Sequence, residues 1–379
     1  MSQDHNYIYY GTKCDSGEVA QFLHHTLDAN EAAEGQGRPK TPVCIWGAHG
    51  IGKTQLVEQV AQERGCKWAY IAPAQFEEMG DLVGMPQIVQ ESDGSRTTHF
   101  APPDWAPREE GPGILLIDDV NRADDRILRG IMQLMQNYAL VSWAIPKGWH
   151  IILTANPDGG DYSVTPMDFA MITRMMHVTM VFDVKRWAFW AEKHAVDPRG
   201  INFVLSYPET ISQERTTPRT LVQFFESIQA IPNLRTEMGL VKMLADSCLD
   251  STTVTAFMSF VSNRLSRLIT PEEIMNATDF EREVYGPVKD QVVGETKRVD
   301  IISVICTRLV NYLTVSNRLL TDAQVNNLAQ FLMIDFLPND IRMNTLRELS
   351  ASRNDSAVRI VRHPELGRLL LSATGSWSE

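Results

Sequence analysis

Residues 47 to 55 read GAHGIGKTQ and directly follow the apolar run VCIW at residues 43 to 46. The first eight of these positions match the pattern G-x-x-x-x-G-K-T, between a predicted strand and a predicted helix, which is the context that a phosphate-binding loop requires. Glycines in such a loop let backbone N–H groups converge on anionic oxygens without a Cβ in the way. We therefore predict a phosphate cradle over nine residues: Gly47, Ala48, His49, Gly50, Ile51, Gly52, Lys53, Thr54 and Gln55.

The side chains of this loop suit a nucleotide and its metal ion. Lys53 supplies a positive charge for the β- and γ-phosphates, and Thr54 supplies a hydroxyl ligand for Mg²⁺. The helix expected to begin near Lys53 turns the positive end of its dipole toward the phosphates. The alternative is an ordinary strand–turn–helix that matches the pattern by accident.

Short apolar runs alternate with helical patterns over the first half of the chain. The runs cover residues 41–46, 66–74, 113–119, 150–156 and 177–182, and they are rich in valine, isoleucine and aromatic residues. Strands that alternate with helices are typical of a parallel sheet covered on both faces. After residue 183 the strand signal ends and the remaining patterns are helical. The expected fold is an α/β core with a parallel five-stranded sheet, followed by an all-α region.

Bulk composition restricts the class of protein. The chain has 379 residues, enough for two or three domains, with 44% hydrophobic and 22% charged residues, as in ordinary globular proteins. A net charge of −12 argues against a duplex-binding protein, because such proteins usually carry a basic face. The five cysteines are scattered without a CxxC pair, which indicates reduced thiols inside a cell. We find neither a membrane span nor a signal-peptide pattern and expect a cytoplasmic protein.

Polar residues follow two of the predicted strands. The run GILLI ends in Asp118 and Asp119, and HIILTA ends in Asn156. The first acid suits Mg²⁺, and the second is placed to polarise an attacking water. The amide of Asn156 could position that water against the γ-phosphate. Taken separately, each pattern also fits a solvated turn at the end of a buried strand.

Two arginines are further candidates. Arg174 stands just before the last predicted strand, and Arg219 lies in the first turn of a helix opened by Pro218. A cation at a helix start is unfavourable for the helix dipole, so we expect an anionic partner for Arg219. Either arginine, considered alone, also fits a surface position or a structural ion pair.

In this order and spacing the motifs resemble those of an AAA+ ATPase of the MoxR-type branch, over about residues 40 to 225. The phrases that carry the resemblance are GAHGIGKT, GDLVGMPQIV followed by THFAPPDWAP, ILLIDDVNRADDRILRGIMQLMQ, IPKGWHIILTANPDGGDYSV and ITRMMHV. It implies that the loop is a Walker A motif, that Asp118 and Asp119 form the Walker B pair, and that Asn156 is sensor 1. It also implies that Arg174 is the arginine finger, which reaches the ATP of a neighbouring subunit, and that Arg219 is sensor 2.

The resemblance also implies a domain plan: an N-terminal helical segment (1–36) on the core, an AAA+ core (37–183), an α-helical lid (184–275) and a helical C-terminal extension (276–379). The core carries an insertion within its second helix region near residues 80–105, whose polar centre QESDGSRTT makes a hairpin turn. The implied function is that of an ATP- and Mg²⁺-dependent hydrolase, a hexameric ring that remodels a protein substrate in a chaperone-like manner. A von Willebrand A-domain protein is the expected partner.

One position departs from the family pattern, which has Asp-Glu where this chain has Asp118 and Asp119. The shorter carboxylate of Asp119 stops about 1 Å short of the catalytic water, and a misplacement on that scale can cost roughly 10² in rate. A slow or non-hydrolysing ATP-gated scaffold is therefore one alternative. A nucleic-acid-acting AAA+ motor is another, against which the acidic net charge speaks. Arg122, within the phrase NRADDR, is a candidate for a second contact between subunits.

Overall fold

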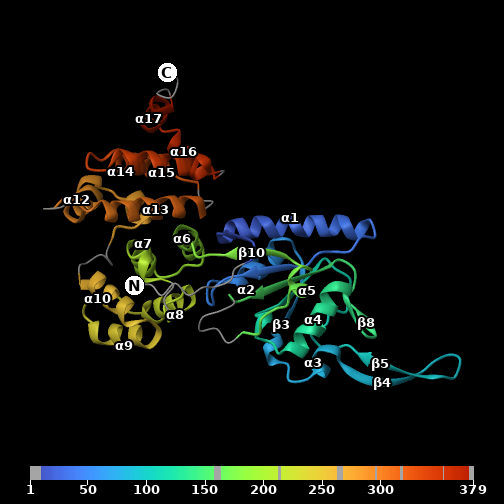
Figure 1. The fold of residues 1–379 in the computed structure, drawn as a ribbon. Helices are drawn as coiled ribbons and strands as arrows, with labels where there is room; N and C mark the ends of the chain where they lie inside the picture. Colours follow the sequence, from blue (N-terminus) through green and yellow to red (C-terminus); the bar gives the residue numbers. More distant parts are fainter. Residues whose placement is uncertain are drawn as a thin grey trace. The chain divides into compact units, whose positions relative to one another are not determined.

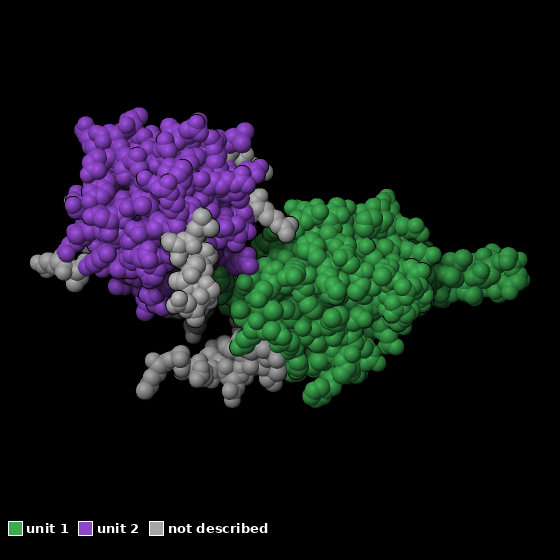
Figure 2. Space-filling model, turned by 90° about the horizontal axis from the view of Figure 1, so that it is seen from above, with its two compact units in different colours: residues 1–183 green, residues 184–379 purple. Residues whose placement is uncertain are grey.

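The computed structural model describes residues 10–157, 164–211, 215–262, 268–294, 297–315, 319–352 and 354–374. The chain divides into two compact units, Met1–Asp183 and Val184–Glu379 (Figures 1 and 2). In its described residues the first unit holds a parallel sheet with helices on both faces, and the second unit is helical. None of the described helices is long and apolar enough to cross a bilayer.

The sheet of the first unit has six strands in the order β1–β10–β2–β9–β6–β3, and every neighbouring pair is parallel. The strands are β1 Thr12–Cys14, β2 Val43–Trp46, β3 Lys67–Ile71, β6 Gly113–Ile117, β9 Trp149–Ala155 and β10 Met176–Met180. The predicted α/β fold with a parallel sheet is confirmed, but the sheet has one strand more than the five expected. The additional strand β1 has only three residues, TKC, two of them exposed, so no apolar run marks it in the sequence.

Alternate side chains of the strands pack against different helices. On one face Val43 and Ile45 pack with α1 Ser16–Gly35 and α2 Lys53–Glu63. On the other face Cys44 and Trp46 pack with α3 Met79–Val83, α4 Asp125–Asn137 and α5 Phe169–Ile172 (Figure 1). Because both faces are covered, the strands β2, β6 and β9 are buried along their whole length rather than at alternate residues.

A hairpin projects from the first unit. Its strands β4 Met85–Gln90 and β5 Arg96–Ala101 pair antiparallel, which confirms the hairpin expected in the insertion, and almost all of its side chains are exposed (Figures 1 and 2). At its root Gly84 has φ 93°, and a Cβ there would lie 1.9 Å from the Ala101 carbonyl oxygen. Only glycine lets the two ends of the hairpin approach so closely. A second, shorter ribbon pairs β7 Ala139–Leu140 with β8 Trp143–Ala144.

The described part of the second unit is built from α-helices and short helical turns. The α-helices are α6 Val184–Lys193, α7 Pro198–Ser206, α8 Pro218–Ile228, α9 Met238–Cys248, α10 Ser251–Ser262, α11 Pro271–Asn276, α12 Gly286–Val292, α13 Val299–Val315, α14 Asp322–Met333, α15 Asn339–Ala351, α16 Asp355–Val361 and α17 Pro364–Thr374. The turns here are η3 Pro208–Thr210 and η5 Glu281–Tyr285, and those of the first unit are η1 Pro73–Gln75 and η2 Val120–Arg122.

A buried ion pair ties the early helices of the second unit to a later one. Arg308 of α13 is 3% exposed, and its guanidinium donates to Glu192 Oε1 of α6 at 3.2 Å and to Asn202 Oδ1 of α7 at 3.2 Å. Removing one member of such a pair leaves an uncompensated charge in the interior, which typically costs about 3–5 kcal/mol. Residues more than a hundred positions apart are thereby held in one core.

Candidate phosphate site

The cradle lies between β2 and α2, at the carboxyl end of the sheet. Gly50 and Gly52 have φ of 71° and 96°, the left-handed region that favours glycine, and Gly52 is the N-cap of α2. Gly47 is needed for a different reason, because a Cβ there would lie 2.6 Å from the Met180 carbonyl oxygen. At each of the three positions predicted to shape the loop, the local geometry therefore explains why the residue is glycine.

Lys53 turns its amine back into the loop. Its Nζ donates to the carbonyl oxygens of Gly47 at 2.8 Å and Ala48 at 3.1 Å, and to Asn156 Oδ1 at 3.2 Å. The residue is only 6% exposed, and a buried ammonium group needs such acceptors to remain charged. The positive charge is thus held inside the loop whose N–H groups are expected to surround a phosphate.

The carboxylate of Asp118 accepts hydrogen bonds from three hydroxyl groups. Thr54 Oγ1 lies 3.0 Å from both of its oxygens, Thr154 Oγ1 donates to Oδ1 at 2.5 Å, and Tyr70 Oη donates to Oδ2 at 3.2 Å. Burial and the negative charge of Asp118 raise the pKa of Tyr70, so its phenol stays protonated and can donate.

The donor atoms at this point fit Mg²⁺. A hydroxyl from Thr54 and a carboxylate from Asp118 are hard oxygen ligands, and Mg²⁺ in nucleotide sites takes few protein ligands besides phosphate oxygens and water. In the described part of the chain no group of three or more His, Cys, Asp or Glu side chains could hold a metal. The hydroxyl–carboxylate pair of Thr54 and Asp118 suits an ion that arrives with a phosphate.

Asn156 joins the lysine to the second acid. Its Oδ1 accepts from Lys53, and its Nδ2 donates to Asp119 Oδ1 at 3.0 Å. The buried Asn121 fixes the backbone of Asn156 from both sides, donating to its carbonyl at 2.8 Å and accepting from its N–H at 3.1 Å. Because the lysine ammonium can only donate and the carboxylate can only accept, the Asn156 amide has one assignment: oxygen toward the cation and nitrogen toward the anion.

Asp119 sits in a backbone conformation that short polar residues tolerate. Its φ and ψ are 49° and 45°, and its N–H donates to Thr154 Oγ1 at 2.8 Å. Its carboxylate is engaged by Asn156 Nδ2 and, at 3.3 Å, by Arg122 Nε. Arg122, predicted as a contact between subunits, thus has an acidic partner within its own chain.

The structure separates Arg174 from the cradle of its own chain. Arg174 lies between α5 and β10, where Met176 pairs with Val43 at the start of β2. The cradle follows the other end of β2, four residues later, so the two lie at opposite ends of the strands, roughly 13 Å apart along β2. The guanidinium of Arg174 donates to Gln136 Oε1 at 3.2 Å and to the carbonyl of Ala170.

Arg219 belongs to the second unit, at the second residue of α8. Thr217 caps this helix and accepts from the Thr220 N–H. Arg219 is exposed, and within the described residues of this chain no hydrogen bond or ion pair engages it. The anionic partner expected for Arg219 therefore stays a prediction, which an anion from outside this chain would have to supply.

Three residues of the site were not predicted: Tyr70, Thr154 and Asn121. Thr154 could have been noticed as a polar residue inside the apolar run HIILTA. Tyr70 and Asn121 carry no comparable mark, because their roles depend on the strand order of the folded sheet. Asn121 belongs to η2, and Tyr70 reaches Asp118 from the neighbouring strand β3.

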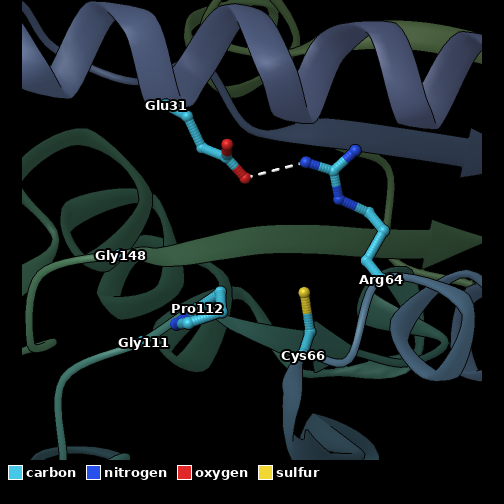
Figure 3. A pocket seen from close by; sticks show the side chains of 6 residues that line it. All are labelled: Glu31, Arg64, Cys66, Gly111, Pro112 and Gly148. Atoms are coloured by element: carbon cyan, nitrogen blue, oxygen red, sulfur yellow. Dashed lines mark hydrogen bonds and ion pairs between the residues drawn. The ribbon is translucent and has the colours of Figure 1, made fainter.

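A cavity of about 570 Å³ opens at the opposite end of the strands (Figure 3). It is lined by Glu31, Arg64, Cys66, Gly111, Pro112 and Gly148. Arg64 donates to Glu31 Oε1 at 2.8 Å across the cavity and also pairs with Asp28, so its charge is already compensated. This cavity is separate from the cradle.

Residues 42–175 match the family model described as "AAA domain (dynein-related subfamily)". Among solved structures, the RuvB Holliday junction branch migration motor of Thermotoga maritima is similar at 15% identity, over 69% of this chain and 76% of that one, with a TM-score of 0.34. A proposed ATPase from Cytophaga hutchinsonii is similar at 14% identity, over 66% and 74%, with a TM-score of 0.33. No curated protein gives a significant match.

The matched segment contains the cradle, both acids, Asn156 and Arg174, and it begins one residue before β2. The structural likenesses have TM-scores below 0.5, so no functional argument rests on them. The family match and the geometry of the loop agree on one assignment. Residues 42–175 carry an AAA domain.

Proposed function

We propose that this chain binds ATP with Mg²⁺ in the cradle and hydrolyses it in a ring, where Arg174 of a neighbouring copy completes each site. The observation that carries the proposal is the hydrogen-bonded series Lys53–Asn156–Asp119 beside the Thr54–Asp118 pair. It brings a lysine cation that can bind phosphate, an amide, a second acid and a pair of metal ligands to one edge of the sheet. This is the set of groups that phosphoryl transfer to water needs.

Each group has a separate task in this proposal. Lys53 leaves the loop carbonyls to bind the β- and γ-phosphate oxygens, while the loop N–H groups surround them. Asp119 accepts a proton from the attacking water, and Asn156 holds that water in line with the γ-phosphate. Mg²⁺, bound by Thr54 and through Asp118, would neutralise charge on the phosphates.

The position of Arg174 supports a shared site. Because it lies at the far end of the strands, it is remote from the cradle of its own chain and available to another copy. An arginine that reaches the γ-phosphate is worth roughly 10³–10⁵ in rate. Hydrolysis should therefore depend on assembly.

Mixing of variants tests the shared site. Arg174→Ala should retain ATP binding and lose turnover by at least about 10³-fold, while Lys53→Ala should lose ATP binding. Mixed together, the two inactive chains should recover part of the activity, because each supplies the half that the other lacks. Arg129→Ala, which removes an exposed arginine paired with Asp125, is the matched control and should change little. Full activity in Arg174→Ala assemblies would contradict the proposal.

We further propose that the ring is of the MoxR type and remodels a protein partner in a chaperone-like manner, with a von Willebrand A-domain protein as the expected partner. The motif series of the sequence and the projecting hairpin in the insertion support this. Asp119→Asn should hold ATP without hydrolysing it and so retain bound partners. A pull-down with this form should recover an A-domain protein or its substrate in an ATP-dependent way. Recovery that does not depend on nucleotide would contradict the proposed remodelling function.

A slow ATP-gated switch is the second candidate function. The observation that favours it is the short Asp119 carboxylate, which is already engaged by Asn156 and Arg122. In this case turnover by the assembled protein is slow, and Asp119→Glu, one methylene longer, raises it. Rapid turnover by the unmodified assembly would remove this candidate.

A further inference from the structure

A hydrogen-bonded link crosses two strands behind the cradle. The indole Nε1 of Trp46 donates to His177 Nδ1 at 3.0 Å, and His177 Nε2 lies 2.8 Å from the carbonyl oxygen of Ile172. Trp46 is the last residue of β2 and immediately precedes Gly47, the first residue of the cradle. Ile172 is the last residue of α5, two positions before Arg174. The link therefore joins the start of the cradle to the turn that carries the arginine.

The partners of His177 determine the tautomer of its neutral ring. An indole N–H can only donate, so His177 Nδ1 must accept and carries no proton. A carbonyl oxygen can only accept, so the proton of the neutral ring lies on Nε2. One imidazole thus serves as acceptor at one end and donor at the other.

The link has a fixed end and an adjustable end. The Trp46 side chain is fully buried, and its ring packs against Tyr10 with centroids 4.8 Å apart, so the indole has no room to turn. The Ile172 carbonyl belongs to a helix of four residues and also accepts from the Met175 N–H at 3.3 Å. Arg174, two residues later, is half-buried: its guanidinium donates to Gln136 and to the Ala170 carbonyl, and its backbone N–H donates to the Met171 carbonyl at 3.2 Å. A displacement of this short helix would therefore carry Arg174 with it.

We propose that His177 is a positioning residue for Arg174: by bridging Trp46 to the Ile172 carbonyl, it ties the cradle of one copy to the arginine that this copy presents to its neighbour. This inference rests on the proposed function. Its consequence is directional. Loss of the link impairs the site of the neighbouring copy more than the site of the copy that carries the change, because the cradle itself keeps its glycines, Lys53 and Thr54.

Mixed assemblies separate the two effects. A chain with Lys53→Ala can contribute only its arginine and is called the finger donor, and a chain with Arg174→Ala can contribute only its cradle and is called the cradle donor. We place His177→Leu in one donor at a time and measure ATP turnover of the mixture. In the finger donor it should lower turnover roughly 10- to 100-fold, the effect of a misplacement of about 1 Å. In the cradle donor the loss should stay below about threefold.

Matched variants protect the test from a folding defect. His177→Gln offers an acceptor and a donor on one side chain and should restore part of the finger-donor activity. Trp46→Phe keeps an aromatic ring but removes the N–H, and it should reproduce the same asymmetry as His177→Leu. Nucleotide affinity of each otherwise unmodified variant, measured by fluorescence titration, should stay within about twofold of the parent.

The outcomes distinguish this inference from the proposed function. If the mixture of the two donors is inactive with His177 intact, the proposal of a shared site is refuted, and the positioning role of His177 is refuted with it. If the mixture is active but His177→Leu and Trp46→Phe lower turnover equally in both donors, only the positioning role is wrong, and the link serves the fold alone. A larger loss in the cradle donor would overturn it in the same way.

Discussion

At the scale of single residues, Thr154 forms hydrogen bonds to both acidic residues of the site. Its hydroxyl donates to Asp118 Oδ1 and accepts from the backbone N–H of Asp119. One oxygen therefore contacts the carboxylate of the proposed metal ligand and the backbone of the residue that carries the proposed proton acceptor. The Asp118 carboxylate and the Asp119 backbone cannot move apart without breaking a bond to this hydroxyl.

Thr154→Val should accordingly damage both stability and activity, because it keeps the shape of the side chain and removes only the hydroxyl. The unpaired N–H of Asp119 should lower the free energy of unfolding by about 1–3 kcal/mol. ATP turnover should fall more than ATP affinity, and the Mg²⁺ concentration needed for half-maximal activity should rise. Thr154→Ser, which keeps the hydroxyl, is the control. Wild-type Mg²⁺ dependence in Thr154→Val would disprove the role.

His150 gives the chain a pH-dependent stability. The residue is 1% exposed, and neither ring nitrogen has a hydrogen-bond partner within the described residues. Burial and, second, the positive charge of Lys40 lower the pKa of His150 from its ordinary 6.5 to about 4, against the opposing charge of Glu31 at 3.8 Å. The folded chain therefore holds the imidazole neutral where the unfolded chain binds a proton.

Because the folded pKa is the lower one, the contribution of His150 is fully present above about pH 6.5 and is lost as the pH falls toward 4. The loss is about 3 kcal/mol at most. Urea unfolding at several pH values between these limits should show a steeper decline for the parent chain than for His150→Leu. Parallel curves for the two proteins would show that His150 does not cause the decline.

At the scale of elements, the β4–β5 hairpin is attached to the first unit mainly at its root. Gly84 and Ala101 approach there without room for a side chain, and the Phe100 N–H donates to Ser142 Oγ at 3.1 Å. Beyond this root the side chains face solvent, with Ile88 76% exposed. The hairpin therefore adds surface to the unit without adding to its core.

Replacing residues 87–99 by an Asn-Gly turn should leave the core intact, since Pro86 and Phe100 remain paired. ATP affinity should stay within about twofold of the parent, because only exposed residues are removed. Gly84→Ala is the contrasting variant and should destabilise the unit by about 1–2 kcal/mol or more, through the left-handed backbone and the clash with Ala101. Calorimetry and nucleotide titration measure both effects, and a tenfold loss of ATP affinity in the trimmed chain would contradict the expectation.

The sequence predicts well those elements whose structure is determined by residues close together in the chain. The apolar runs become β2, β3, β6, β9 and β10, and β2, β6 and β9 are apolar because both of their faces are buried. The cradle can be recognised because its glycines and lysine are close together in the chain. The strand β1 carries no such local pattern, since its three residues form a strand by pairing with β10 rather than because they are hydrophobic.

The candidate site divides in the same way. Asp118, Asp119 and Asn156 follow apolar runs, so their shared edge of the sheet could be predicted from the parallel arrangement alone. Tyr70 and the His177 link could not, because they depend on which strands are neighbours, and strand order is not written in any local pattern. For Arg219 the anionic partner expected from the helix dipole stays a prediction, because the residues that the structure describes can report only contacts within one chain.

At the scale of the whole molecule, a shared site requires copies to meet beside Arg174. Phe169, the first residue of α5, is 79% exposed, and Met176, at the other side of Arg174 in the chain, is 41% exposed. Large apolar side chains so exposed on both sides of the proposed arginine finger are consistent with a surface that a second copy covers in the proposed ring. The proposed ring would place a neighbouring copy there.

Phe169→Ser should therefore weaken assembly without harming the fold. The protein concentration that gives half-maximal specific ATPase activity should rise about tenfold, which corresponds to about 1.4 kcal/mol of association free energy. Ile88→Ser, which removes a similarly exposed side chain from the hairpin, is the control and should leave that concentration unchanged. Sedimentation velocity run over the same concentrations tests the assignment, and equal behaviour of the two variants would refute it.

The Arg308 ion pair has a consequence for how the second unit transmits force. With its guanidinium bound to both α6 and α7, α13 cannot slide past them without stranding a charge in the interior. The helices α6, α7 and α13 are therefore expected to move as one body. A probe attached to α13 should then register a displacement of α6.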